Sequence, residues 1–108
     1  MAHAPIVSGL PSRVRIVEVG PRDGLQDEAV HVPTEAKVRL IELLADAGLE
    51  TVEATSFVSP RAVPQLADAE QVVRAVRRRP GVRYPVLVPN QRGLERALAS
   101  GAREIAVF

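Results

Sequence analysis

Cysteine is absent from this sequence of 108 residues, and aromatic residues make up only 3% of it. The lack of cysteine excludes a disulfide scaffold and any metal site built on thiolates. Stacking platforms for nucleobases need aromatic side chains, and the formal net charge is only +1, from 14 basic and 13 acidic residues. Both features argue against nucleic acid or an anionic membrane as the main partner.

Long apolar runs and targeting patterns are also missing. No stretch approaches the ~20 apolar residues that a membrane span requires. The first eleven residues have no basic start, and Pro5, Gly9 and Pro11 interrupt their apolar positions, which is unlike a signal peptide. We therefore expect a cytoplasmic protein with no membrane partner. The content of 46% hydrophobic and 25% charged residues is typical of one small globular domain.

Short β-branched segments alternate with helical patterns from residue 14 onward. Strands are predicted at residues 14–19, 50–55, 84–88 and 104–108, where short apolar runs are bounded by glycine, proline or polar residues. Three- and four-residue spacing of apolar positions predicts three helices, with stripes at Val38, Ile41, Leu44 and Ala45, at Ala69, Val72, Val73 and Val76, and at Leu94, Ala97 and Leu98. Thr34 is the expected N-cap of the first helix, and Gly48 its end.

The order βαβαβαβ predicts an α/β fold with a parallel sheet and right-handed crossovers. Periodicity leaves two candidates open, a closed (β/α)8 TIM barrel and an open doubly wound sheet. The last strand has no covering helix after it, although parallel strands are normally buried on both faces, and a complete barrel needs about 250 residues. We expect a tail over residues 1–13 and a truncated barrel over residues 14–108, about four strands of it. A compact four-stranded domain is the alternative.

Charged side chains follow the first predicted strand, which is where catalytic groups collect in parallel α/β folds. Arg22 stays protonated and can hold an oxyanion. Asp23 is a hard oxygen ligand suited to Mg²⁺ or Mn²⁺. The alternative interpretation of Asp23-Gly24 is a simple turn.

Glu53 lies inside the second predicted strand, between Val52 and Ala54. A charge at such a position is costly unless it is paired or faces a polar cavity. An edge position facing solvent, or a simple pair with an arginine, explains Glu53 equally well. Asn90 follows the third strand, where it adds an amide to the same rim or forms an ordinary turn.

Two other groups of residues attract attention and are discounted. His3 and His31 have no metal-ligand spacing between them, so we expect both to be surface residues. Arg77, Arg78 and Arg79 could bind an anion, but three cations in the last turn of a helix also complement its dipole, and we favour that interpretation. Glycine-rich phosphate loops are absent from the sequence.

Three segments resemble successive parts of 3-hydroxy-3-methylglutaryl-CoA lyases, namely VEVGPRDGLQDE, ETVEATSFVSPRAVPQLAD and YPVLVPNQRGLERALASGAREIAVF. The resemblance covers residues 14–108. Related metal-dependent aldolases and Claisen-type synthases share the Arg-Asp-Gly core but usually precede it with Thr-Leu, where this chain has Gly20-Pro21. The TSFVSP segment after Glu53 also favours the lyase family.

The resemblance implies a (β/α)8 barrel that uses a divalent cation, Mg²⁺ or Mn²⁺, to cleave an acyl-CoA substrate to acetyl-CoA and acetoacetate. It implies that Asp23 is a metal ligand and that Arg22 stabilises the enolate oxygen of the departing acetyl-CoA. Glu53 is then an active-site carboxylate that organises the polar network. Gln26 and Ser56 are expected near the substrate.

The chemistry of a retro-Claisen cleavage agrees with this assignment, because it needs a base, a cation and positive charge on the forming enolate. The remaining metal ligands of the family are two histidines in a His-x-His arrangement and an asparagine, and they come from later strands. We therefore expect the isolated 108 residues to be inactive. One alternative is a related acyl-CoA lyase or Claisen-type synthase acting on another 3-hydroxy acid. Another is a non-catalytic half-barrel that assembles with a second chain, and a homo-oligomer stays open.

Overall fold

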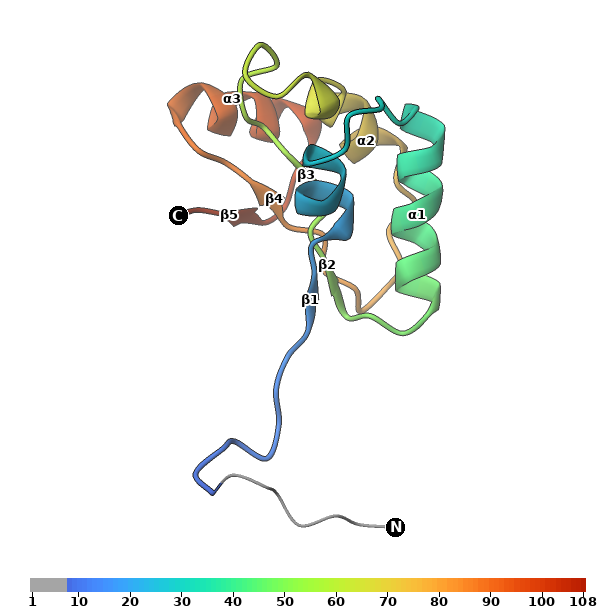
Figure 1. Cartoon of the computed structure of the whole chain (residues 1–108), viewed down its shortest axis with the longest axis vertical. Helices are drawn as coiled ribbons and strands as arrows, with labels where there is room; N and C mark the ends of the chain where they lie inside the picture. The colour runs from blue at the N-terminus through green and yellow to red at the C-terminus, as the bar shows by residue number, and fades with distance from the viewer. Residues whose placement is uncertain (1–7) are drawn as a thin grey trace.

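Short parallel strands alternate with helices along the chain (Figure 1). The structure is a computed structural model that describes residues 8–108, so His3 and part of the predicted tail lie outside the described residues. The strands are β1 (Val17–Glu18), β2 (Thr51–Val52), β3 (Thr55–Ser56), β4 (Val86–Leu87) and β5 (Ile105–Ala106). The helices are α1 (Thr34–Asp46), α2 (Ala69–Ala75) and α3 (Gln91–Ser100), with a π-helical turn η1 (Gly20–Gly24) and a 3-10 turn η2 (Pro64–Leu66).

The strands β2 and β3 are two parts of the single strand that the sequence predicts at residues 50–55. Regular pairing is interrupted at Glu53 and Ala54, yet the hydrogen bonds continue through both residues. The Glu53 amide donates to the Glu18 carbonyl at 2.9 Å, and the Ala54 amide donates to the Pro85 carbonyl at 2.9 Å. The elements therefore form one continuous parallel sheet.

The order of the strands in the sheet distinguishes between the two predicted architectures. Register pairs place Val17 beside Thr51, Thr55 beside Val86, and Val86 beside Ile105, so neighbouring strands follow one another in chain order. A doubly wound sheet reverses its strand order at a switch point, whereas a (β/α)8 barrel does not. The prediction of four consecutive strands from the N-terminal part of a (β/α)8 barrel is confirmed.

The three helices form one layer on a single face of the sheet. Helix α1 packs against α2, and α2 packs against α3. The main core lies between this layer and the strands, and it contains Ile41, Val52, Ala54, Phe57, Val72, Val86 and Ala97. Within the described residues, no helix combines the length and the apolar character needed to cross a bilayer.

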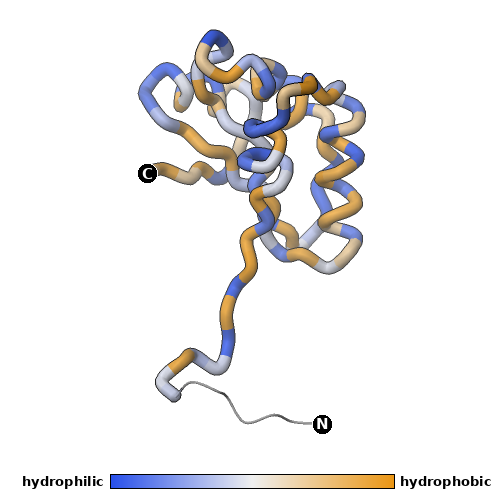
Figure 2. The backbone as a smooth tube through the Cα atoms, in the orientation of Figure 1, coloured by the Kyte–Doolittle hydropathy of each residue, from blue (hydrophilic) through white to orange (hydrophobic). Residues whose placement is uncertain are grey.

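The outer strands are shorter and more exposed than the sequence predicts. Val14 and Ile16 belong to the first predicted strand, but 76% and 66% of their surfaces are exposed, because no described strand pairs with the outer edge of β1. Phe108, at the end of the last predicted strand, is 96% exposed. Figure 2 shows hydrophobic segments at both of these edges. The prediction that residues 14–19 are a buried strand is therefore wrong at its start.

The N-cap of helix α1 lies one residue before Thr34, the residue that the sequence predicts for this position. Pro33 occupies the N-cap position, and the Thr34 hydroxyl instead donates to Asp68 at 2.5 Å. Lys37, which is only 5% exposed, donates from Nζ to Asp68 at 2.6 Å and to the Gln65 carbonyl at 2.5 Å. This polar network joins α1 to the segment that leads into α2. The predicted end of the helix at Gly48 is confirmed by its positive φ of 104°.

The three successive arginines lie beyond α2, because the helix ends at Ala75. The prediction that they occupy its last turn is therefore wrong. The Arg78 guanidinium donates to the carbonyl of Gly101, the residue that caps α3, at 2.8 Å. Arg78 thus complements the carboxyl end of a different helix. His31 is exposed, as expected.

Helix α3 lies close to the backbone that follows β3. Asn90 is its N-cap and accepts a hydrogen bond from the Gly93 amide at 2.8 Å, so the side chain has a structural role where the chain turns into the helix. A Cβ atom added at Gly93 would stand 2.6 Å from the Phe57 carbonyl oxygen. Only glycine allows this approach between the helix and the backbone after β3.

We predict that Gly93→Ala destabilises the chain although alanine is the better helix former. The propensity gain is about 1 kcal/mol, and an overpacking cost of about 1–3 kcal/mol outweighs it because backbone must move. Urea unfolding would show a lower midpoint. Gly24→Ala is the matched control, because a Cβ at Gly24 meets no atom within 4 Å. A Gly93→Ala variant at least as stable as the wild type would contradict the close approach.

Candidate functional site

The chain leaves β1 through the π-helical turn η1. The amides of Arg22, Asp23 and Gly24 all point at the Val19 carbonyl, with N to O distances of 3.1, 2.7 and 3.4 Å. Pro21 is the second residue of the turn, where a missing N–H does no harm. The turn therefore fixes the backbone from which the Arg22 and Asp23 side chains project at the carboxyl end of β1.

An ion pair joins Arg22 to Glu53 in the neighbouring strand. The Arg22 Nε atom lies 2.6 Å from Glu53 Oε1, and their side chains are 19% and 8% exposed. The predicted alternatives for Glu53 included a pair with an arginine, and this is the arrangement found. Since a buried carboxylate without a partner is costly, the pair offsets the desolvation of Glu53 and fixes the direction of the Arg22 side chain.

Asp23 lies beside this pair at a more open position. Its Oδ1 atom is 3.2 Å from Arg22 Nη1, and its side chain is 56% exposed. A carboxylate in this setting keeps lone pairs for a hard divalent cation, so Asp23 fits the ligand type that such ions prefer. Among the described residues, no group of three or more histidine, cysteine, aspartate or glutamate side chains is placed to hold a metal ion. Asp23 thus supplies one candidate ligand.

A cavity of about 480 Å³ opens at the carboxyl ends of the strands. Arg22, Gln26, Glu53 and Ser56 line it, so the structure brings together four of the five residues singled out in the sequence. Apolar wall is added by Val58, Leu87, Pro89 and residues 106–108. The cavity therefore combines a cation, an amide and a hydroxyl with an apolar side, which is the usual character of a small-molecule site.

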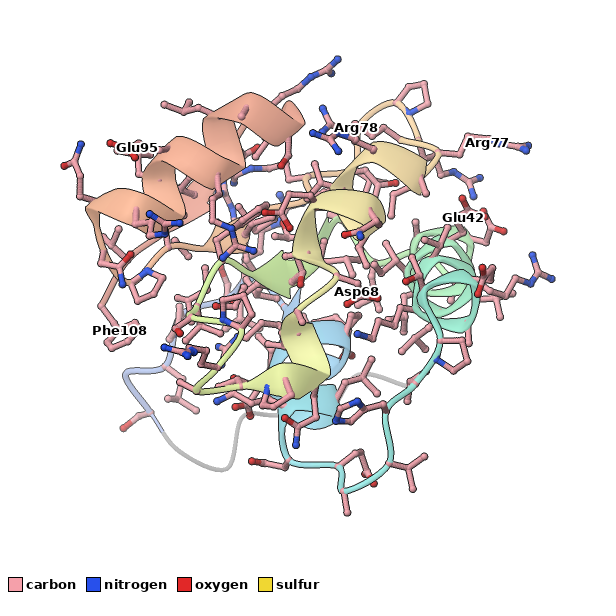
Figure 3. All side chains as sticks on the ribbon, turned by 90° about the horizontal axis from the view of Figure 1, so that it is seen from above. Glu42, Asp68, Arg77, Arg78, Glu95 and Phe108 are labelled. Atoms are coloured by element: carbon pink, nitrogen blue, oxygen red, sulfur yellow. The ribbon has the colours of Figure 1, made fainter. Side chains whose placement is uncertain are left out.

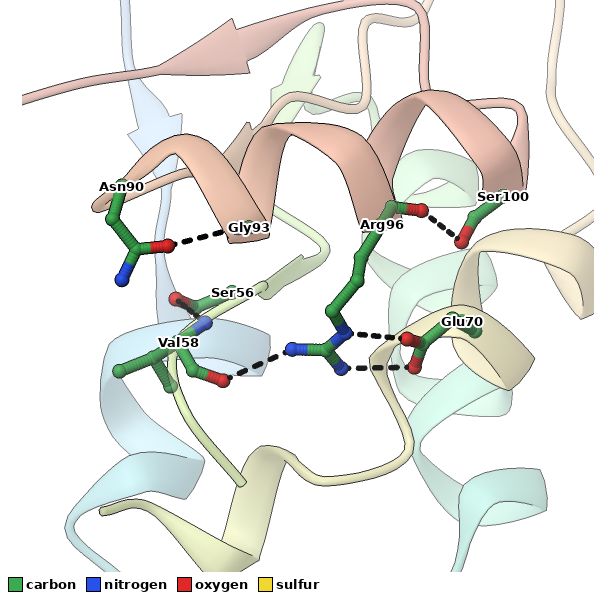
Figure 4. A network of polar contacts seen from close by, with 7 residues as sticks. All are labelled: Ser56, Val58, Glu70, Asn90, Gly93, Arg96 and Ser100. Carbon is green, nitrogen blue, oxygen red and sulfur yellow. Dashed lines mark hydrogen bonds and ion pairs between the residues drawn. The ribbon is translucent and has the colours of Figure 1, made fainter. Parts of the chain in front are cut away.

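Arg96 does not line this cavity but donates to the backbone of Val58, which does, and its role was not foreseen from the sequence. Its guanidinium donates to both carboxylate oxygens of Glu70, at 2.6 and 3.0 Å, and to the Val58 carbonyl at 3.3 Å (Figure 4). It also lies 5.3 Å from the centre of the Phe57 ring. Ser56 is fully buried and accepts the Val58 amide at 3.2 Å. Arg96 therefore holds the segment that places Ser56 in the cavity wall.

A family model described as HMGL-like matches residues 13–108 of this chain. The chain belongs to the HMGL-like family. A mouse relative named cytoplasmic 3-hydroxy-3-methylglutaryl-CoA lyase is 61% identical over 106 residues, which is 98% of this HMGL-like chain and 31% of the relative. The resemblance noted in the sequence is therefore confirmed.

Solved structures of HMG-CoA lyases share the fold of this HMGL-like chain. The enzyme from Pseudomonas aeruginosa superposes with a TM-score of 0.87 at 52% identity, covering 92% of this chain and 33% of that one. The enzyme from Acinetobacter baumannii, solved in complex with coenzyme A and 3-methylmalate, gives a TM-score of 0.83 at 43% identity and covers 86% and 30%. The chain spans about a third of the length of the relatives it matches.

The ion pair between Glu70 and Arg96 is expected to stabilise the fold by an amount that depends on pH. The hydrogen bond from Arg96 holds the pKa of Glu70 below its ordinary value of 4.5, against the opposing effect of burial. Because the folded pKa is depressed, the stabilisation is present above the unfolded pKa and is lost as the pH falls through the folded value. We expect Glu70→Gln to cost about 1–2 kcal/mol at pH 7 and progressively less below pH 4.5.

Urea unfolding at several pH values between 7 and 3 measures this difference. The matched comparison is Glu70→Gln made in an Arg96→Gln background, where the substitution should cost little at any pH because the partner is gone. If Glu70→Gln costs the same at pH 7 and at pH 3 in the otherwise unchanged chain, the hydrogen bond from Arg96 is not what lowers the pKa of Glu70.

Proposed function

We propose that this chain forms the first four strands of a metal-dependent lyase that cleaves 3-hydroxy-3-methylglutaryl-CoA to acetyl-CoA and acetoacetate. The observation that carries the proposal is the Arg22–Glu53 ion pair beside a cavity at the carboxyl ends of the strands, in a chain of the HMGL-like family. The names of the relatives support the reaction, and the Acinetobacter baumannii complex with coenzyme A supports an acyl-CoA substrate.

The proposed reaction breaks one carbon–carbon bond. Loss of the proton from the tertiary hydroxyl turns that carbon into the ketone of acetoacetate, and the bond to the carbon next to the thioester breaks. Its electron pair moves onto the thioester carbonyl, which becomes an enolate oxygen, and a proton then returns to carbon to give acetyl-CoA. Negative charge therefore develops on the enolate oxygen, where a fixed cation lowers the barrier most.

Arg22 is the group of this chain that meets that requirement. Its Nε donates to Glu53 and its Nη1 lies near Asp23, which leaves the outer N–H groups of the guanidinium for an oxygen in the cavity. Glu53 fixes the guanidinium before substrate arrives, so little reorganisation is needed during the reaction. Gln26 and Ser56 are proposed to lie near the substrate, because both residues line the same cavity.

Asp23 is proposed as the contribution of this chain to a divalent cation site. Its exposed carboxylate is a hard oxygen donor of the kind that Mg²⁺ and Mn²⁺ prefer. Such a cation, when bound, supplies positive charge that orients the hydroxyl and carboxylate of the substrate.

A cytoplasmic location is also a proposal. The mouse relative named cytoplasmic supports it, but relatives named mitochondrial match as well. Fractionation of the source cells, followed by detection of the protein with an antibody, would distinguish these locations. The homo-oligomer considered from the sequence stays a prediction.

The proposed function can be tested in a chimera in which residues 13–108 replace the matching segment of the Pseudomonas aeruginosa enzyme, which has the same fold over this region. We expect metal-dependent release of acetoacetate from 3-hydroxy-3-methylglutaryl-CoA. A panel of other 3-hydroxyacyl-CoA thioesters tests the substrate. A folded chimera that prefers a longer acyl chain, or that releases no acetoacetate, would defeat this proposal.

Arg22→Gln in the same chimera tests the residue that carries the mechanism. We expect turnover to fall by about 100-fold or more, the scale of losing an oxyanion donor, with little change in circular dichroism. The matched control is Arg39→Gln, which removes the same charge from an exposed position on α1. Near-normal turnover of the folded Arg22→Gln chimera would remove Arg22 from the mechanism.

A further inference from the structure

A second cavity, of about 280 Å³, lies at the opposite ends of the strands from Arg22 and Glu53. It opens beside the segments that lead into β4 and β5. Four arginines line it, namely Arg78, Arg79, Arg83 and Arg103, together with a single acidic side chain, Glu104. The candidate lyase site uses none of these residues.

Three of the four guanidinium groups are held in place by the protein. Arg78 donates to the Gly101 carbonyl at 2.8 Å, and Figure 3 shows its side chain at the end of α3. Arg79 pairs with Asp46 at 2.6 Å. Arg83 donates from Nε to both oxygens of Glu104, at 3.0 and 2.9 Å. These contacts direct the three guanidinium groups, while the side chains of Arg79 and Arg83 keep 53% and 54% of their surfaces exposed to a ligand.

Arg103 is the fourth arginine of the cavity and is exposed beside Glu104. Within residues 8–108 it makes no hydrogen bond or ion pair, so its full set of donors is available. The four arginines exceed the two paired carboxylates, Asp46 and Glu104, and the cluster keeps an excess of positive charge. Like charges that converge on one cavity repel one another unless an anion neutralises them.

Complementing helix dipoles explains only part of this cluster. Arg78 reaches the carboxyl end of α3, and that contact has a structural purpose. Arg83 and Arg103 come from the segments just before β4 and β5, and neither lies at the carboxyl end of a helix. Hydrogen bonding also keeps the pKa of Glu104 below its ordinary value, with Arg83 as the main cause. The charged carboxylate of Glu104 therefore accepts the hydrogen bonds of Arg83.

We propose that this cavity binds a small phosphorylated anion through Arg83 and Arg103, with Arg78 and Arg79 adding positive charge. The planar fork of a guanidinium matches phosphate oxygens in a bidentate manner, and several arginines around one cavity favour a polyvalent anion over a monovalent one. The anion would compete with Glu104 for Arg83. Inorganic diphosphate and the diphosphate of coenzyme A share this chemistry.

Calorimetric titration of the purified chain with sodium pyrophosphate, at fixed ionic strength, tests the proposal. We expect one saturable site. Arg103→Gln should weaken binding by about tenfold, because a charge-assisted hydrogen bond is lost. Glu104→Gln should tighten binding severalfold, because the competing carboxylate is gone. Arg39→Gln, which removes an exposed positive charge from α1, should leave the affinity within about twofold.

The opposite directions expected for Arg103→Gln and Glu104→Gln separate a built site from general attraction to a basic surface. Absence of saturable binding by the wild type would overturn the proposal. So would an Arg39→Gln variant that loses as much affinity as Arg103→Gln, or a Glu104→Gln variant that binds no more tightly. Titration with coenzyme A then identifies the source, since binding that depends on Arg103 favours its diphosphate, and no binding favours a free phosphate anion.

Discussion

The ion pair between Glu53 and Arg22 is the interaction on which the arrangement of the cavity depends. Glu53 places a carboxylate inside a parallel sheet, where an unpaired charge would be costly, and regular strand pairing is interrupted at the same residue. Arg22 can reach it because three amides of the turn η1 converge on the Val19 carbonyl and set the backbone direction. The position of the ion pair in the cavity wall therefore depends both on the turn η1 and on the interruption of the strand at Glu53.

The order and type of the elements could be predicted from the sequence because they follow from local patterns. Apolar spacing located α1 and α3, and glycines at positions 48 and 101 marked their ends. Strand lengths were predicted less well, since pairing depends on neighbours that no local pattern describes. Val14 has a strand-like sequence, yet it lies outside the paired residues of β1. The periodicity also gives no information on the order of the strands in the sheet, which distinguished the barrel from the doubly wound sheet.

The candidate site could be predicted where a residue type was unusual for its position. Arg22 and Asp23 lie in the loop after a strand, and Glu53 interrupts an apolar strand, so each drew attention by itself. The supporting residues gave no such signal. Arg96 looks like any polar residue on a helix, and its partners Glu70 and Val58 are 26 and 38 positions away. Lys37 is buried although lysine is usually exposed, because its ammonium group donates hydrogen bonds to Asp68 and to a backbone carbonyl.

The order of the strands in the sheet has a consequence for how the chain acquires its structure. Helix α1 contacts α2 and α2 contacts α3, while each strand pairs with the next one in the chain. Each strand therefore finds its partner after a single intervening helix, and no strand pair waits for a more distant part of the chain. A ribosome releases the amino end first, so each newly emerged strand meets a partner that is already outside the exit tunnel. The topology thus suits growth of the structure from its amino end during translation.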